Sequence, residues 1–151
     1  MPLYNYILDN FLSSITSFGT PVFYALVILI LLKFQVPFAL NLFLALIFVE
    51  ILCIFIKLIY QKERPIPQPR KEFFDKIDAN SFPSVHSARI SLLVTMIIMY
   101  YKDIFFLVLG FSLMILVGYS RIYLKKHYLK DVLFGFLIGI VVALVAVYIK
   151  I

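Results

Sequence analysis

Three groups of polar residues interrupt a sequence that is otherwise strongly apolar. The first group is Lys57, followed seven positions later by Arg64 and Pro65. Seven residues make almost two turns of an α-helix, so the two cations share one face if the helix continues as far as Arg64. A pair of cations is suited to binding an anion such as phosphate. Each cation alone is equally well explained as a snorkelling side chain at the edge of a membrane.

The second group is the segment 83–87, which reads Pro-Ser-Val-His-Ser. A polar turn that opens a helix presents free backbone N–H groups and the positive end of the helix dipole to an anion. Ser84 or Ser87 can add a hydroxyl donor. A serine at this place is also an ordinary N-cap, and that alternative stays open. Capping does not, however, require the imidazole of His86.

The third group is Ser120 and Arg121, then His127 after five residues, then Asp131 after three more. If Asp131 lies in the first turn of a helix and His127 one turn before it, the carboxylate and the imidazole can meet. A carboxylate on one ring nitrogen fixes the tautomer and leaves the other nitrogen free as a nucleophile. The spacing therefore predicts an oriented histidine.

Two histidines and an aspartate are also residue types that bind metals. The same three groups, however, supply Lys57, Arg64 and Arg121, which repel a metal cation and attract phosphate. We therefore predict an anion site without a metal.

The composition defines the setting of these groups. Hydrophobic residues make up 64% of the 151 residues and charged residues 15%, against roughly half and a quarter in soluble domains. A soluble protein of this size could not bury so much apolar surface. The net charge of +6 is therefore no argument for nucleic-acid binding; in a membrane protein it fits equally a positive-inside bias or a site for an anion.

Five apolar stretches approach the length of about 20 residues that a helix needs to cross a bilayer. They are Pro21–Phe34, Phe38–Ile56, Ala88–Tyr101, Ile104–Tyr119 and Val132–Ile149. The first and third are short, and the third suffices only if the end near Ser87 is buried in protein. The sequence thus predicts an all-α integral membrane bundle of five transmembrane helices, in a single domain over residues 1–151.

Residues 3–18 show a different pattern. Apolar side chains recur at helical spacing with Asn, Asp and Ser between them, which is typical of an amphipathic helix at the membrane interface. A frayed start to the first span explains the pattern equally well. With five spans, the connections 57–87 and 120–131 lie on one face of the membrane, together with the N-terminus.

The order and spacing of the three groups resemble the type 2 phosphatidic acid phosphatase superfamily, which also includes the vanadium haloperoxidases. The family signature is K-x6-R-P, then P-S-G-H, then S-R-x5-H-x3-D. Here it reads Lys57…Arg64-Pro65, Pro83-Ser84-Val85-His86 and Ser120-Arg121…His127…Asp131. Both long spacings match without an insertion, and the resemblance extends from about Phe48 to the C-terminus.

The resemblance implies a role for each matching residue. His127 attacks phosphorus and forms a phosphohistidine, Asp131 orients and stabilises it, and His86 protonates the leaving oxygen. The phosphoryl oxygens are held by Lys57, Arg64, Ser84, Arg121 and N–H groups near His86, a set to which Val85 contributes backbone. Cations of this kind can neutralise phosphoryl oxygens without a metal or other cofactor.

Two features depart from the family pattern. Val85 replaces the family's Gly, and a β-branched residue does not easily take a positive φ, which affects the expected phosphate cradle. The family's lipid phosphatases commonly have six spans, and five are predicted here. Outside the signature, Ser120, Glu50 and Arg89 are candidates for a supporting role. We expect Glu50 to form a structural ion pair, and Arg89 to reach the phosphate or a carboxylate.

The predicted function is therefore hydrolysis of a membrane lipid phosphate. The resemblance and the small size of the chain favour an isoprenyl diphosphate carrier lipid as the substrate, ahead of phosphatidate or phosphatidylglycerol phosphate. A membrane protein that binds a lipid phosphate without catalysis is the alternative from another class, and a phosphatase of soluble esters is a third. The partners expected are the lipid and the bilayer, with no nucleic acid and no obligate protein partner.

Two charge counts disagree on which side of the membrane holds the site. Eleven of the 14 basic residues lie in or beside the connections 57–87 and 120–131, which favours the cytoplasm. The N-terminal tail has no basic residue and Lys33 follows the first span, which favours the opposite orientation. Similar lipid phosphatases act on the extracytoplasmic face, and we expect the same here, in the cell membrane.

Overall fold

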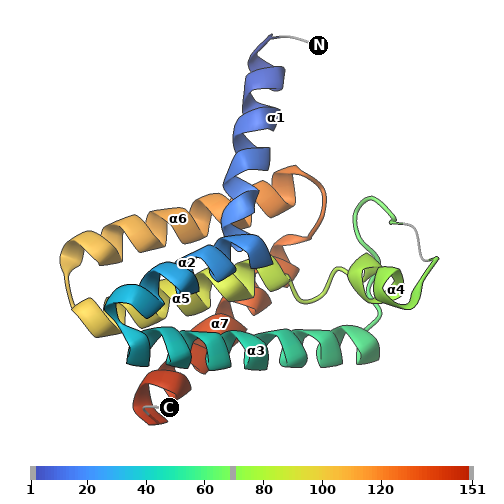
Figure 1. The fold of residues 1–151 in the computed structure, drawn as a ribbon. Helices are drawn as coiled ribbons and strands as arrows, with labels where there is room; N and C mark the ends of the chain where they lie inside the picture. Colours follow the sequence, from blue (N-terminus) through green and yellow to red (C-terminus); the bar gives the residue numbers. More distant parts are fainter. Residues whose placement is uncertain (1–2, 69–70, 150–151) are drawn as a thin grey trace.

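The structure is a computed structural model that describes residues 3–68 and 71–149 (Figure 1). Its elements in chain order are α1 (Leu3–Ile15), the 3-10 helix η1 (Thr16–Gly19), α2 (Pro21–Phe34), α3 (Val36–Ile59), α4 (Phe73–Ala79), α5 (Val85–Tyr101), α6 (Ile104–Tyr123) and α7 (Leu129–Ile149). One isolated antiparallel bridge joins Glu63 to Asn80. The predicted all-α fold is thereby confirmed.

Proline and capping residues account for several helix boundaries. Pro21 and Pro37 lie in the first turns of α2 and α3, where a missing N–H costs nothing. Ser84 and Asp103 cap the N-termini of α5 and α6 through their side chains. The helix α3 ends at Ile59, so it does not continue to Arg64 as the seven-residue spacing required.

The helix α5 lies at the centre of the bundle and packs most extensively against α7 (Figure 1). Gly135 and Gly139 allow this close approach, because a Cβ at either position would collide with backbone carbonyl oxygens of α5. The main apolar core also includes α2 and α3, for example Leu42 and Val49, which are fully buried. The central position of α5 fixes its N-terminus, where the predicted His86 lies.

Among the residues that the structure describes, three helices, α3, α6 and α7, are long and apolar enough to cross a membrane. Their outer faces carry many exposed Leu, Ile, Phe and Val side chains, as lipid-facing surfaces do. The 17-residue α5 is shorter than a span, although Ser87 at its N-terminal end is fully buried, as that prediction required. A multi-pass membrane protein is thus supported, while the predicted count of five spans is not confirmed.

The N-terminal segment forms a bent pair of helices. Residues Tyr6–Gly19 and Pro21–Phe34 meet at 54° and are long and apolar enough for one span only when taken together; if the pair is one span, the described residues contain up to four. The helix α1 contacts α6, and the Tyr123 hydroxyl donates a hydrogen bond to Asp9 over 2.9 Å. The segment is therefore a broken span or a re-entrant pair by length and composition, and an interfacial helix is not confirmed.

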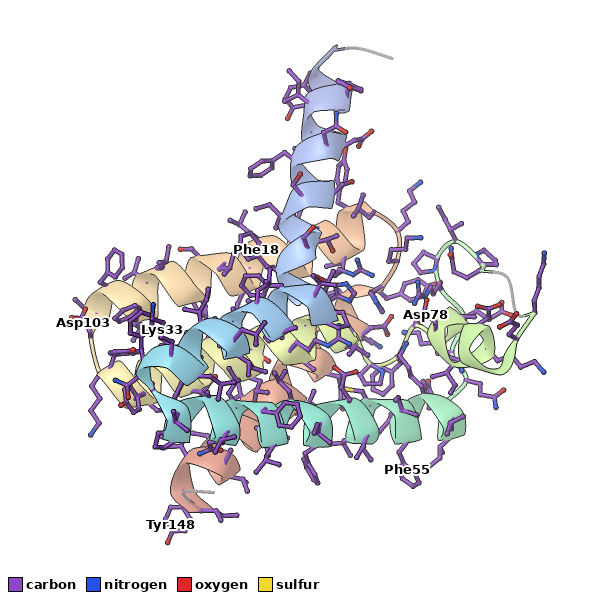
Figure 2. The ribbon with its side chains drawn as sticks, in the orientation of Figure 1. Phe18, Lys33, Phe55, Asp78, Asp103 and Tyr148 are labelled. Carbon is purple, nitrogen blue, oxygen red and sulfur yellow. The ribbon has the colours of Figure 1, made fainter. Side chains whose placement is uncertain are left out.

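The two long connections meet at one end of the bundle. The Ser84 N–H of the first connection donates to the Asp131 carbonyl of the second over 2.9 Å. The Phe82 ring packs between Tyr60 and Phe134, with centroids 5.2 and 4.9 Å away. Figure 2 shows Asp78 at this end, whereas Lys33 and Asp103 lie at the opposite end. The residues of all three sequence groups therefore come from the end of the bundle that carries α4.

Candidate active site

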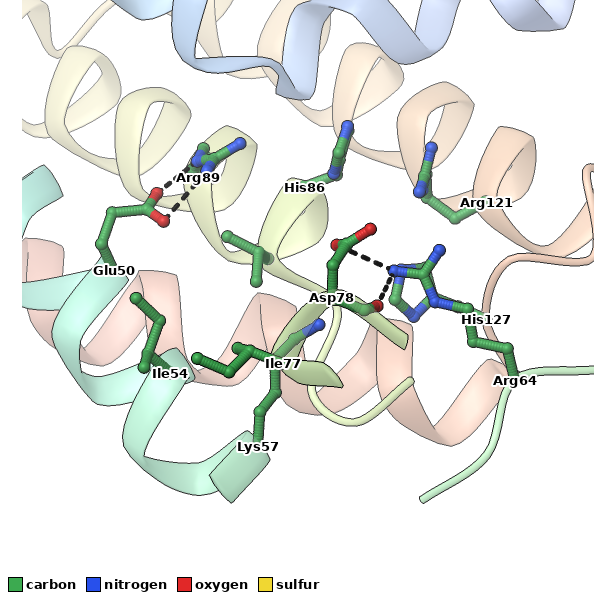
Figure 3. A pocket seen from close by; sticks show the side chains of 11 residues that line it. Glu50, Ile54, Lys57, Arg64, Ile77, Asp78, His86, Arg89, Arg121 and His127 are labelled. Carbon is green, nitrogen blue, oxygen red and sulfur yellow. Dashed lines mark hydrogen bonds and ion pairs between the residues drawn. The ribbon is translucent and has the colours of Figure 1, made fainter. Parts of the chain in front are cut away.

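A cavity of about 330 Å³ opens where the two connections meet (Figure 3). It is lined by Glu50, Ile54, Lys57, Arg64, Ile77, Asp78, Val85, His86, Arg89, Arg121 and His127. Four of these side chains are cationic and two are carboxylates. Such an excess of cations around a partly enclosed cavity suits an anionic ligand.

Lys57 reaches this cavity from the last turns of α3. Its side chain is 3% exposed, and its Nζ donates to the Asn80 carbonyl over 2.7 Å. The Asn80 side chain donates in return to the Lys57 carbonyl over 3.0 Å. This reciprocal pair joins the end of α3 to the segment after α4. It therefore holds a cation whose charge faces the cavity.

Arg64 enters from the chain beyond α3, and its position does not depend on helical spacing. Its Nη2 donates both to the carbonyl of Asp78 and to the Asp78 carboxylate, the latter over 3.0 Å. The Asp78 side chain is 79% exposed, while that of Arg64 is 6% exposed. A carboxylate that no sequence pattern singled out thus lies beside the cations of the cavity.

Two buried donors at this cavity lack partners. The Nε atoms of Arg64 and Arg121 are buried and make no hydrogen bond to any residue that the structure describes. Arg121 comes from α6, and its Nη1 donates to Thr16 Oγ1 over 2.7 Å. Buried donors without partners are costly, and a bound phosphoryl group would supply acceptors for both.

His127 lies in the connection between α6 and α7 and is 3% exposed. Its Nδ1 lies 2.7 Å from the Ser81 carbonyl oxygen, which only accepts, so Nδ1 carries the hydrogen and Nε2 is free. Burial, followed by the positive charges of Arg121, Arg64 and Lys57, lowers the pKa of His127 to about 2, while the Ser81 hydrogen bond acts in the other direction. The ring is therefore neutral at pH 7, as a nucleophile requires.

Asp131 does not make the hydrogen bond that its spacing from His127 predicted. It lies in the first turn of α7 as expected, but its Oδ2 is 4.0 Å from His127 Nδ1. That oxygen accepts instead from the Tyr128 N–H over 2.9 Å, and Oδ1 accepts from Lys62 Nζ over 2.6 Å. The carbonyl of Ser81 has taken the hydrogen-bonding position predicted for Asp131, because it comes closer to the ring.

The N-terminus of α5 brings Val85 and His86 to the cavity. The Ser84 side chain is fully buried and accepts from Ser87 N–H over 3.4 Å and Ser87 Oγ over 2.9 Å, so it serves as an N-cap. Val85 is the first residue of α5 and has a helical backbone, so the positive φ that a Gly would allow is not used. A Cβ at Gly19 would lie 2.6 Å from the His86 ring, so η1 packs tightly against it.

Glu50 and Arg89 pair across the cavity wall, as expected for a carboxylate within an apolar helix. The Arg89 Nε and Nη2 atoms donate to the two Glu50 oxygens, the second over 2.9 Å, and Nη1 donates to the Gly19 carbonyl over 2.7 Å.

Ser120 is fully buried and donates to the Val117 carbonyl over 2.7 Å. Ser84, Ser120 and Asp131 are not among the described residues that line the cavity.

Sequence reasoning missed three contributors: Lys62, Asp78 and the Ser81 carbonyl. Lys62 also lies over the Tyr128 ring, with Nζ 4.5 Å from the centroid. Its position two residues before Arg64 was a signal, since cations near a signature share its surroundings. A backbone carbonyl carries no signal in a sequence. Within residues 3–68 and 71–149, no group of three His, Cys, Asp or Glu side chains is placed to hold a metal ion.

An all-helical membrane fold with a cationic cavity around a neutral histidine defines a phosphate-handling membrane protein. A family model of the PAP2 superfamily matches residues 38–150. The chain belongs to this superfamily, which confirms the resemblance and the predicted class of enzyme, a phosphatase acting on phosphoric esters.

Two crystal structures share the fold. One is LpxE of Aquifex aeolicus, with a TM-score of 0.77 and 24% identity over 94% of this chain and 86% of that one. The other is a transmembrane PAP2 type phosphatidylglycerolphosphate phosphatase of Bacillus subtilis, with a TM-score of 0.77 and 24% identity over 95% of this chain and 76% of that one. At this identity the likeness concerns the arrangement of the helices.

Proposed function

We propose that this protein hydrolyses a membrane lipid phosphate without a metal, through a phosphohistidine on His127. The observation that carries the proposal is the state of His127. The ring is buried and neutral, with Nδ1 committed to Ser81 and Nε2 free, beside the unpartnered Nε donors of Arg64 and Arg121. A nucleophile next to buried donors for phosphoryl oxygens is what phosphoryl transfer requires.

In the first step, His127 Nε2 attacks phosphorus and the bond from phosphorus to the leaving oxygen breaks. Lys57, Arg64 and Arg121 neutralise the charge on the remaining phosphoryl oxygens. His86, which also lines the cavity (Figure 3), donates a proton to the leaving oxygen. Burial, followed by the positive charge of Arg121, lowers the pKa of His86 to about 2, and the negative charge of the bound phosphoryl group raises that pKa again so that His86 can act as the acid. The products of this step are the dephosphorylated lipid and a phosphohistidine.

In the second step, water attacks the phosphohistidine. His86, now without its proton, takes one from the water, and the bond between Nε2 and phosphorus breaks. Inorganic phosphate leaves and both imidazoles return to their starting states. Throughout, the positive charge that develops on His127 is stabilised by the carboxylate of Asp131, 4.0 Å from Nδ1.

A phosphate-release assay in detergent tests this function. The substrates are an isoprenyl diphosphate, which the family resemblance favours, phosphatidate, phosphatidylglycerol phosphate and a soluble aryl phosphate, each with and without EDTA. We expect release from at least one lipid and no effect of EDTA. Loss of activity with EDTA would contradict the metal-free mechanism, and lipid binding without release would favour the non-catalytic alternative.

We further propose that the site faces the extracytoplasmic side of the cell membrane. The single cysteine, Cys53, is fully buried and does not interfere with labelling. An impermeant maleimide added to intact cells should label Lys130→Cys, at the end that carries the site, and leave Lys33→Cys unlabelled. Both side chains are exposed. The opposite labelling pattern would place the site in the cytoplasm.

A further inference from the structure

A second recess lies on the other side of the Glu50–Arg89 pair. It has a volume of about 330 Å³, and both Glu50 and Arg89 line it as well as the phosphate cavity. Its remaining walls are apolar side chains of α2 and α3, together with Tyr24. The ion pair therefore separates a cationic cavity from a mostly apolar recess, and any ligand that spans both must pass it.

Tyr24 brings an unexplained polar group to this recess. Its side chain is 3% exposed, and its hydroxyl is buried without a hydrogen-bond partner among the described residues. The ring is held by an edge contact with Phe23, at 5.4 Å between centroids, so a phenylalanine would pack as well. A buried hydroxyl without a partner costs stability, which a purely structural role does not explain.

The Glu50–Arg89 pair leaves room for a ligand oxygen beside the Tyr24 hydroxyl. The donors of Arg89 are directed to Glu50 and to the Gly19 carbonyl, whereas the Glu50 side chain remains 33% exposed (Figure 3). An oxygen placed here would accept from the Tyr24 hydroxyl, and a hydroxyl could also donate to Glu50. A bare hydrocarbon chain would leave the Tyr24 hydroxyl without a partner.

We propose that Tyr24 and the Glu50–Arg89 pair form a second subsite, which binds an uncharged oxygen of the lipid close to its phosphate. This inference rests on the proposed function, since it takes the phosphate cavity to hold the phosphoryl group of the same lipid. The ligand class is a lipid phosphate whose backbone carries an ester carbonyl or a hydroxyl, so the subsite favours phosphatidate or phosphatidylglycerol phosphate over the isoprenyl diphosphate that the family resemblance favours. The apolar walls formed by Ala25, Ile28 and Leu46 then contact the adjoining chain.

Matched substrates test the subsite. Dioleoyl phosphatidate has ester carbonyls, its dialkyl ether analogue lacks them, a lysophosphatidate adds a hydroxyl, and oleyl phosphate has no oxygen beyond the phosphoester. Tyr24→Phe should lower kcat/KM about fivefold to tenfold on the oxygen-bearing substrates that use the subsite, and less than twofold on oleyl phosphate. The ether and lyso compounds then distinguish a carbonyl ligand from a hydroxyl ligand.

Tyr100→Phe is the matched control, because it also removes one hydroxyl. That hydroxyl has a partner, Gln35 Oε1 at 2.8 Å, and lies at the far end of α5. It should leave kcat/KM unchanged on all four substrates. Tyr24→Phe should not lower the Tm of the ligand-free protein, because no hydrogen bond is lost. The subsite would be overturned if Tyr24→Phe had an equal effect on every substrate or lowered the Tm. It would also be overturned if Tyr24→Phe had no effect on any substrate, a result that would indicate that water alone occupies the recess.

If the proposed function itself is wrong, the wild-type protein will hydrolyse none of the four substrates. In that case the rise in Tm on adding dioleoyl phosphatidate, with oleyl phosphate for comparison, still measures binding. We expect the rise with phosphatidate to be smaller in Tyr24→Phe than in wild type, and the rise with oleyl phosphate to be equal. Equal rises with phosphatidate in both proteins would overturn the subsite without reference to catalysis.

Discussion

Lys62 Nζ lies 2.6 Å from Oδ1 of Asp131, a carboxylate that is fully buried in the first turn of α7. The contact joins residues 69 positions apart and connects the two long connections of the chain. It holds in place the carboxylate whose Oδ2 lies 4.0 Å from His127 Nδ1. We therefore expect Lys62 to be a positioning residue that acts through Asp131.

Replacing Lys62 should thus affect both stability and rate. Lys62→Gln leaves the Asp131 charge buried with one fewer partner, so we expect the free energy of unfolding to fall by about 2 kcal/mol. We also expect a lower kcat, with a smaller change in KM, because the carboxylate moves relative to His127. Lys130→Gln, at an exposed position beside Asp131, is the control. Equal effects of the two variants would show that only surface charge matters.

His127→Ala should abolish turnover while leaving the anion site intact. The cations Lys57, Arg64 and Arg121 are held by Asn80, Asp78 and Thr16, and none of these contacts involves the imidazole. Vanadate or phosphate should therefore still bind, as isothermal calorimetry can measure. Acid-labile phosphate trapped during wild-type turnover and absent from the variant would identify the intermediate. Hydrolysis by His127→Ala at the wild-type rate would exclude His127 as nucleophile.

His86→Ala should be sensitive to the leaving group. An activated aryl phosphate departs with little protonation, whereas a lipid alkoxide needs a proton in the transition state. We expect a loss on the order of 10²–10⁴-fold on a lipid phosphate and a much smaller loss on the aryl phosphate. A plot of log kcat against leaving-group pKa should become steeper in the variant. An unchanged slope would assign the proton to another group.

Asp78→Asn should tighten the binding of inorganic phosphate. The Asp78 carboxylate competes for Arg64, while its backbone carbonyl also accepts from Arg64 and remains in the variant. Removing this exposed negative charge should lower the Ki of vanadate or phosphate by about twofold to fivefold. Asp75→Asn removes the same charge from α4 and can still accept from the Glu72 N–H, so it is the matched control. Weaker binding in Asp78→Asn would show that the carboxylate mainly positions Arg64.

The low pKa of His127 predicts a specific dependence on pH. Because its pKa is lowered from 6.5 to about 2, the native state binds fewer protons here than the unfolded chain. This contribution to stability is complete above about pH 6.5 and decreases as the pH falls below that value. Between pH 7 and pH 5, the free energy of unfolding should therefore fall by about 1–2 kcal/mol less in His127→Gln than in wild type.

Nitrogen NMR can observe the same histidine directly. The chain has two histidines, so His86→Gln leaves a single imidazole signal. We expect it to report a neutral ring protonated at Nδ1 from pH 8 to pH 5, because the Ser81 carbonyl accepts from that atom. A ring that titrates near pH 6.5 would contradict the buried, cation-surrounded position of His127.

Several features of the site could be predicted from the sequence because they are local. Asp131 lies in the first turn of a helix that starts at Leu129, and the polar turn before α5 begins a helix at Val85. The prediction that Lys57 and Arg64 lie at one site is met, but the helical spacing used to predict it was the wrong reason. The helix ends at Ile59, and Arg64 reaches the cavity through the chain that follows.

What the sequence by itself determined is the apolar, helical character of the chain and the set of residues that bear the chemistry. Hydrophobic runs and short spacings act within a few turns, so they can be read along the chain. The tertiary structure alone decided which atom orients His127 and which cation neutralises Asp131. Ser81 lies 46 positions from His127 and Lys62 lies 69 from Asp131, and the 4.0 Å separation that replaced the expected hydrogen bond depends on how the two connections pack. Distances between such segments are set by the packing of α5 against α7, a property of the whole bundle.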